Sequence, residues 1–344
     1  MDIDTVSQPK KSIEQLQIEN LPWVEKYRPK SLDDLIAHDG IIGTIQKLID
    51  KNSLPHLLFY GPPGTGKTST IQATARKLYG DQYSRMVLEL NASDDRGIDV
   101  VREQIKTFAS SMFFFQSSVP YKLIILDEAD AMTNHAQTAL RRVIEKYTKT
   151  TRFCIICNYV VKIIPALQSR CTKFRFSPLP KAAALKRVTD IAAQEHIDIT
   201  TDAINSIVTL GEGDMRKCLN VLQSASMSNH KKIDREAIYR CTGQPSPKDI
   251  SNILSSLLDD DYSTAFKNIS ELKKVKGLSL TDIVKELVPA IFKMNLHNTT
   301  LMKLGSALSD IEFNLSNGAS DKLQLGSLIG SFAIYRDEET KIKK

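Results

Sequence analysis

One sequence in the first half of this 344-residue chain predicts how that half folds: Gly61-Pro62-Pro63-Gly64-Thr65-Gly66-Lys67-Thr68. It follows the apolar run at 57–60 and leads into a helical pattern, which is the strand-loop-helix context of a G-x4-G-K-T phosphate loop. The glycines let backbone N–H groups turn inward around phosphates, and the positive end of the following helix favours the anion. We therefore predict that this loop and Ser69 bind a nucleoside triphosphate, with Lys67 on the β- and γ-phosphates and the Thr68 hydroxyl on Mg²⁺.

The composition limits the class of protein. The length predicts two or three domains, and 46 Lys and Arg against 40 Asp and Glu give a charge of +6 that suits a polyanionic partner. Five cysteines form no metal-type array with His, and Cys154 and Cys157 lie in an apolar run, where buried strand residues are expected rather than zinc ligands or a redox pair. No stretch approaches the ~20 apolar residues of a membrane span, so we expect a soluble, intracellular protein without a membrane partner.

The order of apolar patterns predicts the domain organisation. Apolar runs bounded by turns recur at 57–60, 86–90, 121–126, 153–157 and 174–176. Helical patterns separate them, one beginning near Ser93 and Asp94, and this alternation predicts an α/β domain with a parallel sheet covered on both faces. Beyond the Pro-Leu-Pro at 178–180 only helical patterns follow, interrupted by a linker-like segment at 242–247. We predict a flexible tail and three domains, at 1–18, 19–180, 181–242 and 243–344.

Polar residues follow two predicted strands where the phosphate loop also emerges. Asp127 and Glu128 end the run at 121–126, and we expect Asp127 to hold Mg²⁺ and Glu128 to accept the proton of the attacking water. Asn158 follows the run at 153–157 and is expected to orient water or sense hydrolysis. Arg216, in a Gly-Asp-Met-Arg sequence that opens a helix, is expected to reach the phosphates. Taken singly, a solvated acidic turn, a turn-forming Asn and a surface Arg are the ordinary alternatives.

Six segments together resemble the small subunits of eukaryotic replication factor C, the AAA+ sliding-clamp loader, and most closely the fungal subunit-3 type. They are WVEKYRP at 23–29, the phosphate loop, NASDDRG at 91–97, LDEAD at 126–130, SRC at 169–171 and GDMR at 213–216. The resemblance covers about residues 20 to 344 and implies an α/β P-loop AAA+ domain, a small helical lid domain and an all-α collar domain. One departure is Ile36-Ala37-His38, beside the expected adenine pocket, where the family commonly has a Gly-Gln pair.

The resemblance also implies a function. The chain would be an ATPase subunit of a nuclear hetero-pentamer that uses ATP and Mg²⁺ to open the sliding clamp PCNA and load it onto primer-template DNA during replication and repair. Its partners would be the large subunit and the homologous small subunits. Val24 and Arg28 would seat the adenine and ribose side of ATP, and Arg170 would be an arginine finger for the neighbouring subunit's ATP. Basic groups that track the DNA backbone without reading sequence would be Arg96, Arg102 and Lys162.

Other functions remain alternatives. A different AAA+ machine acting on DNA, such as a branch-migration motor, would need a C-terminal DNA-reading domain, whereas no winged-helix strands are predicted here. An adaptor that binds ATP without hydrolysing it would have no use for Glu128 and Asn158. The letters Asp-Glu-Ala-Asp at 127–130 also spell the signature of DEAD RNA helicases, but the paired-domain motifs of that family are absent from the sequence.

Overall fold

The computed structural model describes residues 21–92, 98–111, 119–228, 232–294 and 296–342, with the backbone alone at 98–102 and 337–342. The predicted tail at 1–18 and the predicted helix start at Ser93 and Asp94 lie outside these residues. The chain divides into two compact units, Met1–Gln223 and Ser224–Lys344. None of the helices in the described ranges combines the length and apolar composition that a membrane crossing requires.

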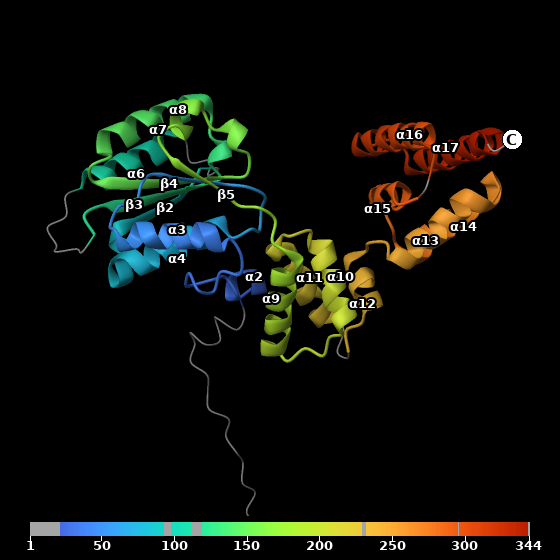
Figure 1. Ribbon diagram of the computed structural model, residues 1–344, viewed down its shortest axis with the longest axis horizontal. Coiled ribbons are helices and arrows are strands. Elements are labelled where there is room, and N and C mark those ends of the chain that lie inside the picture. Colours follow the sequence, from blue (N-terminus) through green and yellow to red (C-terminus); the bar gives the residue numbers. More distant parts are fainter. Residues whose placement is uncertain (1–20, 93–97, 112–118, 229–231, 295, 343–344) are drawn as a thin grey trace, which may run out of the picture. The chain divides into compact units, whose positions relative to one another are not determined.

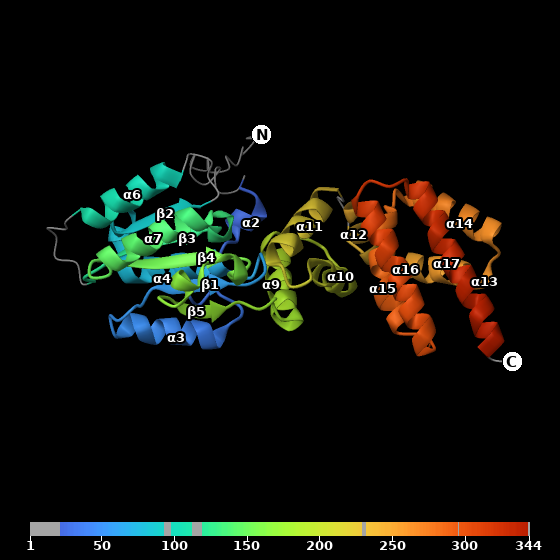
Figure 2. The ribbon, with the colours of Figure 1, turned by 90° about the horizontal axis from the view of Figure 1, so that it is seen from above.

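The first unit holds a parallel sheet. Its strands are β1 (Leu57–Tyr60), β2 (Val87–Asn91), β3 (Lys122–Asp127), β4 (Thr151–Cys157) and β5 (Thr172–Arg175). They lie in the order β2-β3-β4-β1-β5, which can be followed in Figure 2, and every neighbouring pair is parallel. The structure thus confirms the predicted parallel sheet. Strand bounds differ from the predicted ones by up to two residues, because hydrogen-bonded pairing extends from the apolar runs into polar residues such as Thr151 and Thr172.

Helices cover both faces of this sheet (Figure 1). On one face, α3 and α4 pack on Leu123 and Ile125, and on the other, α6 and α7 pack on Ile124 and Leu126. Successive strand side chains point to opposite faces, which is why a strand buried on both faces has a continuous apolar sequence.

The helices of the first unit are α2 (Trp23–Lys26), α3 (Asp39–Asp50), α4 (Lys67–Tyr79), α5 (Tyr83–Met86), α6 (Ile98–Ser110), α7 (Asn134–Tyr147), α8 (Pro165–Gln168), α9 (Lys181–Gln194), α10 (Thr201–Gly211) and α11 (Met215–Ser228), whose last residues enter the second unit.

Short 3₁₀ turns complete the first unit: η1 (Gly80–Gln82), η2 (Ala129–Ala131) and η3 (Val160–Lys162). The predicted cysteine environment is confirmed, since Cys154 and Cys157 are buried in β4, and burial raises the pKa of the Cys157 thiol to about 12. Because α9, α10 and α11 follow the last strand, they fall in the predicted lid domain. We refer to these three as the lid helices.

The described part of the second unit is wholly helical, as predicted. Its elements beyond α11 are α12 (Arg235–Thr242), α13 (Pro247–Asp259), α14 (Tyr262–Lys276), α15 (Leu280–Phe292), α16 (Asn298–Ser316) and α17 (Asp321–Ile342). One core joins α13 to α17 through fully buried side chains such as Leu287 and Leu328. The linker-like segment lies between α12 and α13, and the domain boundaries at 180/181 and 242/243 stay predictions.

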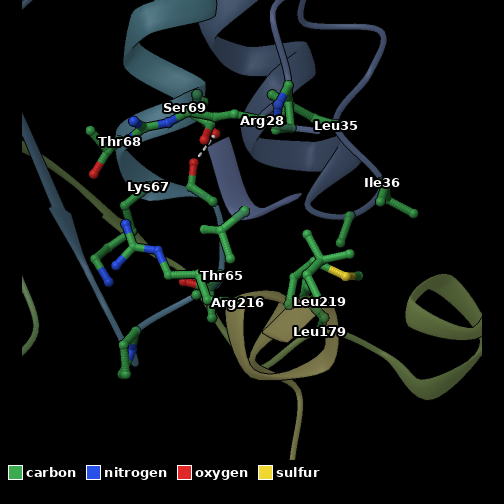
Figure 3. Close-up of a pocket in the computed structure, with 18 of the residues that line it drawn as sticks. Arg28, Leu35, Ile36, Thr65, Lys67, Thr68, Ser69, Leu179, Arg216 and Leu219 are labelled. Atoms are coloured by element: carbon green, nitrogen blue, oxygen red, sulfur yellow. Dashed lines mark hydrogen bonds between the residues drawn. The ribbon is translucent and has the colours of Figure 1, made fainter. Parts of the chain in front are cut away.

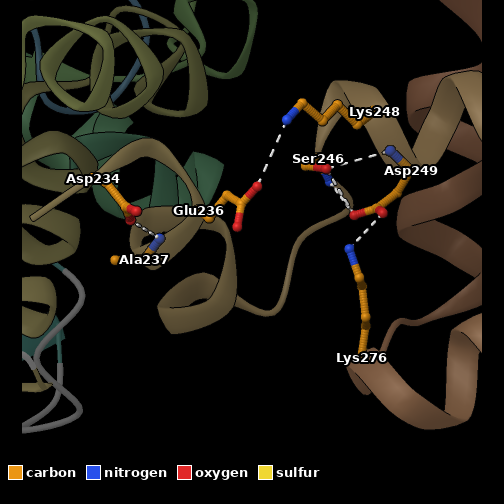
Figure 4. A network of polar contacts seen from close by, with 7 residues as sticks. All are labelled: Asp234, Glu236, Ala237, Ser246, Lys248, Asp249 and Lys276. Atoms are coloured by element: carbon orange, nitrogen blue, oxygen red, sulfur yellow. Dashed lines mark hydrogen bonds and ion pairs between the residues drawn. The ribbon is translucent and has the colours of Figure 1, made fainter.

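Asp249 ties the start of α13 to the end of α14 (Figure 4). The residue is only 4% exposed. Its Oδ1 lies 2.5 Å from Lys276 Nζ, and its Oδ2 accepts hydrogen bonds from the Ser246 backbone N–H at 3.1 Å and the Ser246 hydroxyl at 2.7 Å. Ser246 Oγ in turn accepts the Asp249 N–H at 3.3 Å, so the two residues form a capping box that begins α13.

Replacing Asp249 by Ala is expected to destabilise the helical unit by about 2 kcal/mol, because the helix cap and the partners of a buried carboxylate are lost together. Burial raises the pKa of Asp249, but the Lys276 and Ser246 hydrogen bonds outweigh it and hold the pKa below its usual value. The contribution is therefore present above the unfolded-state pKa near 4 and is lost as the pH falls through the lower folded-state pKa. Urea unfolding at pH 7 and at acidic pH measures both effects. The exposed Asp259 of the same helix, changed to Ala, is the control, and an equal midpoint for the two variants would contradict the prediction.

Candidate nucleotide-binding site

The phosphate loop occupies the edge of the sheet where the strands end. It joins β1 to α4, and its glycines Gly61, Gly64 and Gly66 adopt positive φ values of 144°, 66° and 95°. The last residue of β1 is level with Cys157, the last residue of β4, so Asn158 emerges beside the start of the loop. The structure confirms the predicted strand-loop-helix context and forms a cradle in which backbone groups can approach phosphates closely.

Lys67 is held at the mouth of this cradle. Its side-chain ammonium donates hydrogen bonds to the backbone oxygens of Gly61 and Pro62, both at 2.8 Å, and to Asn158 Oδ1 at 3.0 Å. The residue is 8% exposed, and burial lowers the pKa of Lys67 while the neighbouring Asp127 carboxylate opposes this. The ammonium has neutral acceptors around it, so a phosphate oxygen would offer it a stronger, charged partner.

Thr68 and Asp127 place two oxygen ligands side by side. The Thr68 hydroxyl donates to Asp127 Oδ2 at 2.6 Å. A hydroxyl and a carboxylate next to a phosphate cradle are the donors that Mg²⁺ uses when phosphates supply further oxygens, so these two residues fit the predicted metal. Glu128 follows β3 with φ 53°, in the left-handed region, and its exposed side chain lines the same cleft.

Asp130 fixes the loop that carries Asn158. Its Oδ2 accepts the backbone N–H groups of Asn158 and Tyr159, both at 3.3 Å. No role was predicted for Asp130, although it lies in the same acidic run as Asp127. The available signal was its position shortly after the end of β3, beside the neighbouring strand β4 that Asn158 follows.

The cleft continues from the phosphate loop toward the N-terminal segment and the lid helices (Figure 3). Three residues predicted to contact nucleotide, Val24, Arg28 and Arg216, line it together with Lys67 and Thr68, and so do Ser69, Asp127, Glu128 and Asn158. The cleft also has apolar wall residues that were not predicted: Leu35, Leu179, Met215 and Leu219. Their sequence pattern is that of ordinary core positions, so no signal distinguished them. The departure from the family pattern, Ile36-Ala37-His38, also borders this cleft, and His38 Nε2 is buried without a hydrogen-bond partner in the described structure.

The start of lid helix α11 contacts the phosphate loop directly. The Met215 N–H donates to the Gly64 backbone oxygen at 3.2 Å. Asp214 Oδ1 accepts the N–H groups of Arg216 at 2.8 Å and Lys217 at 3.3 Å, which begins α11. Because this cap fixes the first turn of α11, the exposed Arg216 lies at the edge of the cleft, and its contact with the phosphates stays a prediction.

Replacing Gly61 by Ala is expected to collapse this site. An added Cβ would lie 2.0 Å from the Phe176 backbone oxygen, and a φ of 144° is one that side-chain-bearing residues rarely adopt. The phosphate loop or β5 must shift, at a cost of about 3 kcal/mol. Thermal unfolding together with binding of a fluorescent ATP analogue checks this. Gly43→Ala, which has open space on α3, should retain both properties, and equal behaviour of the two variants would refute the close-approach argument.

Several residues of the predicted sites lie away from the cleft or outside the residues that the structure describes. Arg170 follows α8 and is exposed, with Nη2 2.5 Å from Glu145 Oε1 and Nη1 donating to the Ala166 oxygen at 2.7 Å. Lys162 is exposed in η3, with Nζ 5.4 Å from the centre of the Tyr159 ring. Arg96 falls outside the described residues, and the side chain of Arg102 on α6 is not among them.

Two protein families match the chain. The ATPase family associated with various cellular activities (AAA) matches residues 57–179, and the replication factor C C-terminal domain matches residues 245–331. Among solved structures, RuvB of Thermotoga maritima, a Holliday junction branch migration motor, aligns with a TM-score of 0.52 at 13% identity over 71% of this chain and 85% of that chain. This likeness shows a shared fold alone.

Curated relatives align along nearly the whole chain. Probable replication factor C subunit 5 of Dictyostelium discoideum is 67% identical over 98% of this chain and 99% of its own length. Replication factor C subunit 5 of Homo sapiens is 53% identical, covering 93% of this chain and 94% of that protein. Replication factor C subunit 3 of Saccharomyces cerevisiae is 50% identical, and the alignment covers 96% of this chain and 98% of that protein. With these relatives, both family matches and a complete phosphate loop, the chain belongs to the replication factor C subunits, the AAA ATPases of the clamp loader.

Proposed function

We propose that this chain binds ATP with Mg²⁺ in the cleft and hydrolyses it within a nuclear assembly that opens PCNA and loads it onto primer-template DNA in replication and repair. The observation that carries the proposal is the convergence of Lys67, Asn158 and the Thr68–Asp127 pair on one phosphate cradle. Asp127 ends β3, Asn158 follows β4, and Lys67 and Thr68 begin α4, after the loop that follows β1. In a replication factor C subunit, a cleft of this kind supports nucleotide-driven work on the clamp.

The side chains of the cleft divide the chemistry between them. Lys67 neutralises charge on the β- and γ-phosphates, and Thr68 and Asp127 would hold Mg²⁺, which supplies further neutralisation of the phosphate oxygens. The Glu128 carboxylate accepts the proton of the attacking water. Asn158, fixed through Asp130, orients that water and contacts the Lys67 ammonium. Phosphoryl transfer depends mainly on positioning and charge stabilisation. These side chains therefore provide the groups that one subunit contributes to a hydrolysis site.

Arg170 supplies the other half of a site to a neighbouring subunit. It is exposed, lies outside the lining of its own cleft, and its present partner Glu145 is also exposed. An exposed ion pair of this kind contributes little free energy, so a phosphate can replace Glu145 at small cost. The finger in trans makes hydrolysis depend on assembly.

The remaining roles rest on the family. Lys162, Arg96 and Arg102 are proposed to contact the phosphate backbone of the duplex, and the exposure of Lys162 supports this. The helical second unit is proposed to join the subunits as a collar. It exposes large apolar side chains that a subunit interface would cover, among them Tyr262, Phe292, Met302, Phe313, Leu323 and Ile334.

The proposal is tested by purifying the tagged chain under native conditions with whatever assembles with it. ATPase is then measured with and without PCNA and primed DNA. We expect replication factor C subunits to copurify, and we expect PCNA and primed DNA together to stimulate hydrolysis strongly. Full activity of the lone chain, indifferent to both, would instead indicate a different AAA motor.

A further inference from the structure

The N-terminal segment that borders the nucleotide cleft is fastened to a lid helix through one carboxylate. Glu195 directly follows α9, and its Oε1 accepts hydrogen bonds from Lys26 Nζ and from the Tyr27 hydroxyl, both at 2.5 Å. The Lys26 and Glu195 side chains are only 21% and 19% exposed, so this ion pair is less screened than a surface pair. One acidic group therefore holds two consecutive residues of the segment.

Two further bonds connect the same segment to the lid helices. Arg187 Nη2, on α9, donates to the Tyr27 backbone oxygen at 3.1 Å. The Trp23 N–H donates to Gln223 Oε1, on α11, at 3.1 Å. The four contacts join residues more than 150 positions apart in the chain, and all of them end on α9, on α11 or on the residue that follows α9.

Different elements of the fold therefore hold the two ends of the cleft. Lys67, Thr68 and Asn158 line the phosphate end and are carried by the strands of the sheet and by α4. The opposite end is lined by Val24, Tyr27 and Arg28 of the N-terminal segment, together with Leu179, Met215 and Leu219. If the lid helices turn, the N-terminal wall must follow them or break its bonds to Glu195.

We propose that residues 23–29 form a nucleoside wall that moves with the lid helices, and that Glu195 is the positioning residue which sets the affinity for the nucleoside part of ATP. The inference rests on the proposed binding of ATP in this cleft. Closing the lid then brings the wall onto the base and ribose, and opening the lid withdraws it from them. Nucleotide release is thereby coupled to lid angle through the nucleoside, in addition to the contact that Arg216 is predicted to make with the phosphates.

A role confined to folding stability predicts a different result from a positioning role. A variant that merely loosens the first unit would weaken every ligand of the cleft. Loss of the Glu195 hydrogen bonds would weaken the binding of ATP. It would not change the binding of inorganic tripolyphosphate, which contacts only the phosphate end of the cleft. The comparison of these two ligands therefore isolates the wall.

The experiment uses the full chain and a fluorescent ATP analogue displaced by ATP or by tripolyphosphate. For Glu195→Ala we expect about a tenfold loss of ATP affinity, the equivalent of ~1.4 kcal/mol, with tripolyphosphate affinity unchanged. Glu195→Gln, which still accepts from Tyr27 but lacks the charge, should fall between Ala and the native residue. Glu212→Ala, an exposed carboxylate at the end of α10, is the matched control and should bind both ligands normally.

Two outcomes would overturn the inference: ATP affinity unchanged in Glu195→Ala, or equal losses for ATP and tripolyphosphate. Failure of the native chain to bind ATP at all would instead overturn the proposed function. The native chain and the variant thus report on separate claims.

Discussion

Replacing Glu128 by Gln is expected to slow ATP hydrolysis at this site by about 10²- to 10⁴-fold, the range that a general base contributes. Gln keeps the size of the side chain and its place in the lining of the cleft but cannot accept a proton from water. ATP binding should persist, because the predicted phosphate and metal contacts come from Lys67, Thr68 and Asp127. The variant should therefore hold ATP without consuming it.

The measurement is the identity of the bound nucleotide. Assembled complexes are incubated with labelled ATP, filtered and quenched, and the nucleotide on this subunit should remain triphosphate in the variant. Glu103→Gln, an exposed carboxylate on α6, controls for the loss of a surface charge. Conversion to diphosphate at the native rate would exclude Glu128 as the base.

The Arg170→Ala variant is expected to slow hydrolysis in the adjoining subunit by about 10³-fold or more, the contribution typical of an arginine finger. Binding of ATP to the variant chain itself should be unchanged, since Arg170 does not line its own cleft. Folding stability should fall by less than about 1 kcal/mol, because the partner lost is an exposed Glu145. Arg170→Lys should restore little, since an ammonium lacks the planar fork of the guanidinium.

Arg141 offers a matched control for this variant. Its Nε lies 3.3 Å from the same Glu145 Oε1 atom, on the exposed side of α7. Arg141→Ala removes the same kind of ion pair without removing the proposed finger. Equal ATPase rates in complexes carrying Arg170→Ala and Arg141→Ala would show that Arg170 has no role in trans.

The sequence predicts the sheet and the phosphate end of the cleft because both depend on local patterns. A strand buried on two faces, such as β3, has a continuous apolar run, and a glycine-rich loop between a strand and a helix has few other uses. Asp127 and Asn158 could be placed because parallel strands end at one edge of the sheet. The polar residues at the start of β4 escaped prediction, since Thr151 and Arg152 carry no strand pattern of their own.

The nucleoside end of the cleft could not be predicted in the same detail. Its apolar wall residues Leu179, Met215 and Leu219 have the spacing of ordinary core positions. Glu195 reads as a solvated charge at a helix end, and its partner Tyr27 lies far away in the sequence. Such contacts depend on how distant segments pack, which motif spacing does not encode. The roles of Arg170 and of the DNA-contacting residues require a second molecule and stay predictions from the family pattern.

Loading of labelled PCNA onto primed circular DNA would show whether this chain works in the clamp loader. Complexes reconstituted with and without this chain are incubated with ATP, and the PCNA retained on DNA is counted after gel filtration. We expect retention to require both ATP and this chain. If the purified chain binds ATP but complexes that lack it retain as much PCNA as complexes that contain it, the chain has no place in the clamp loader.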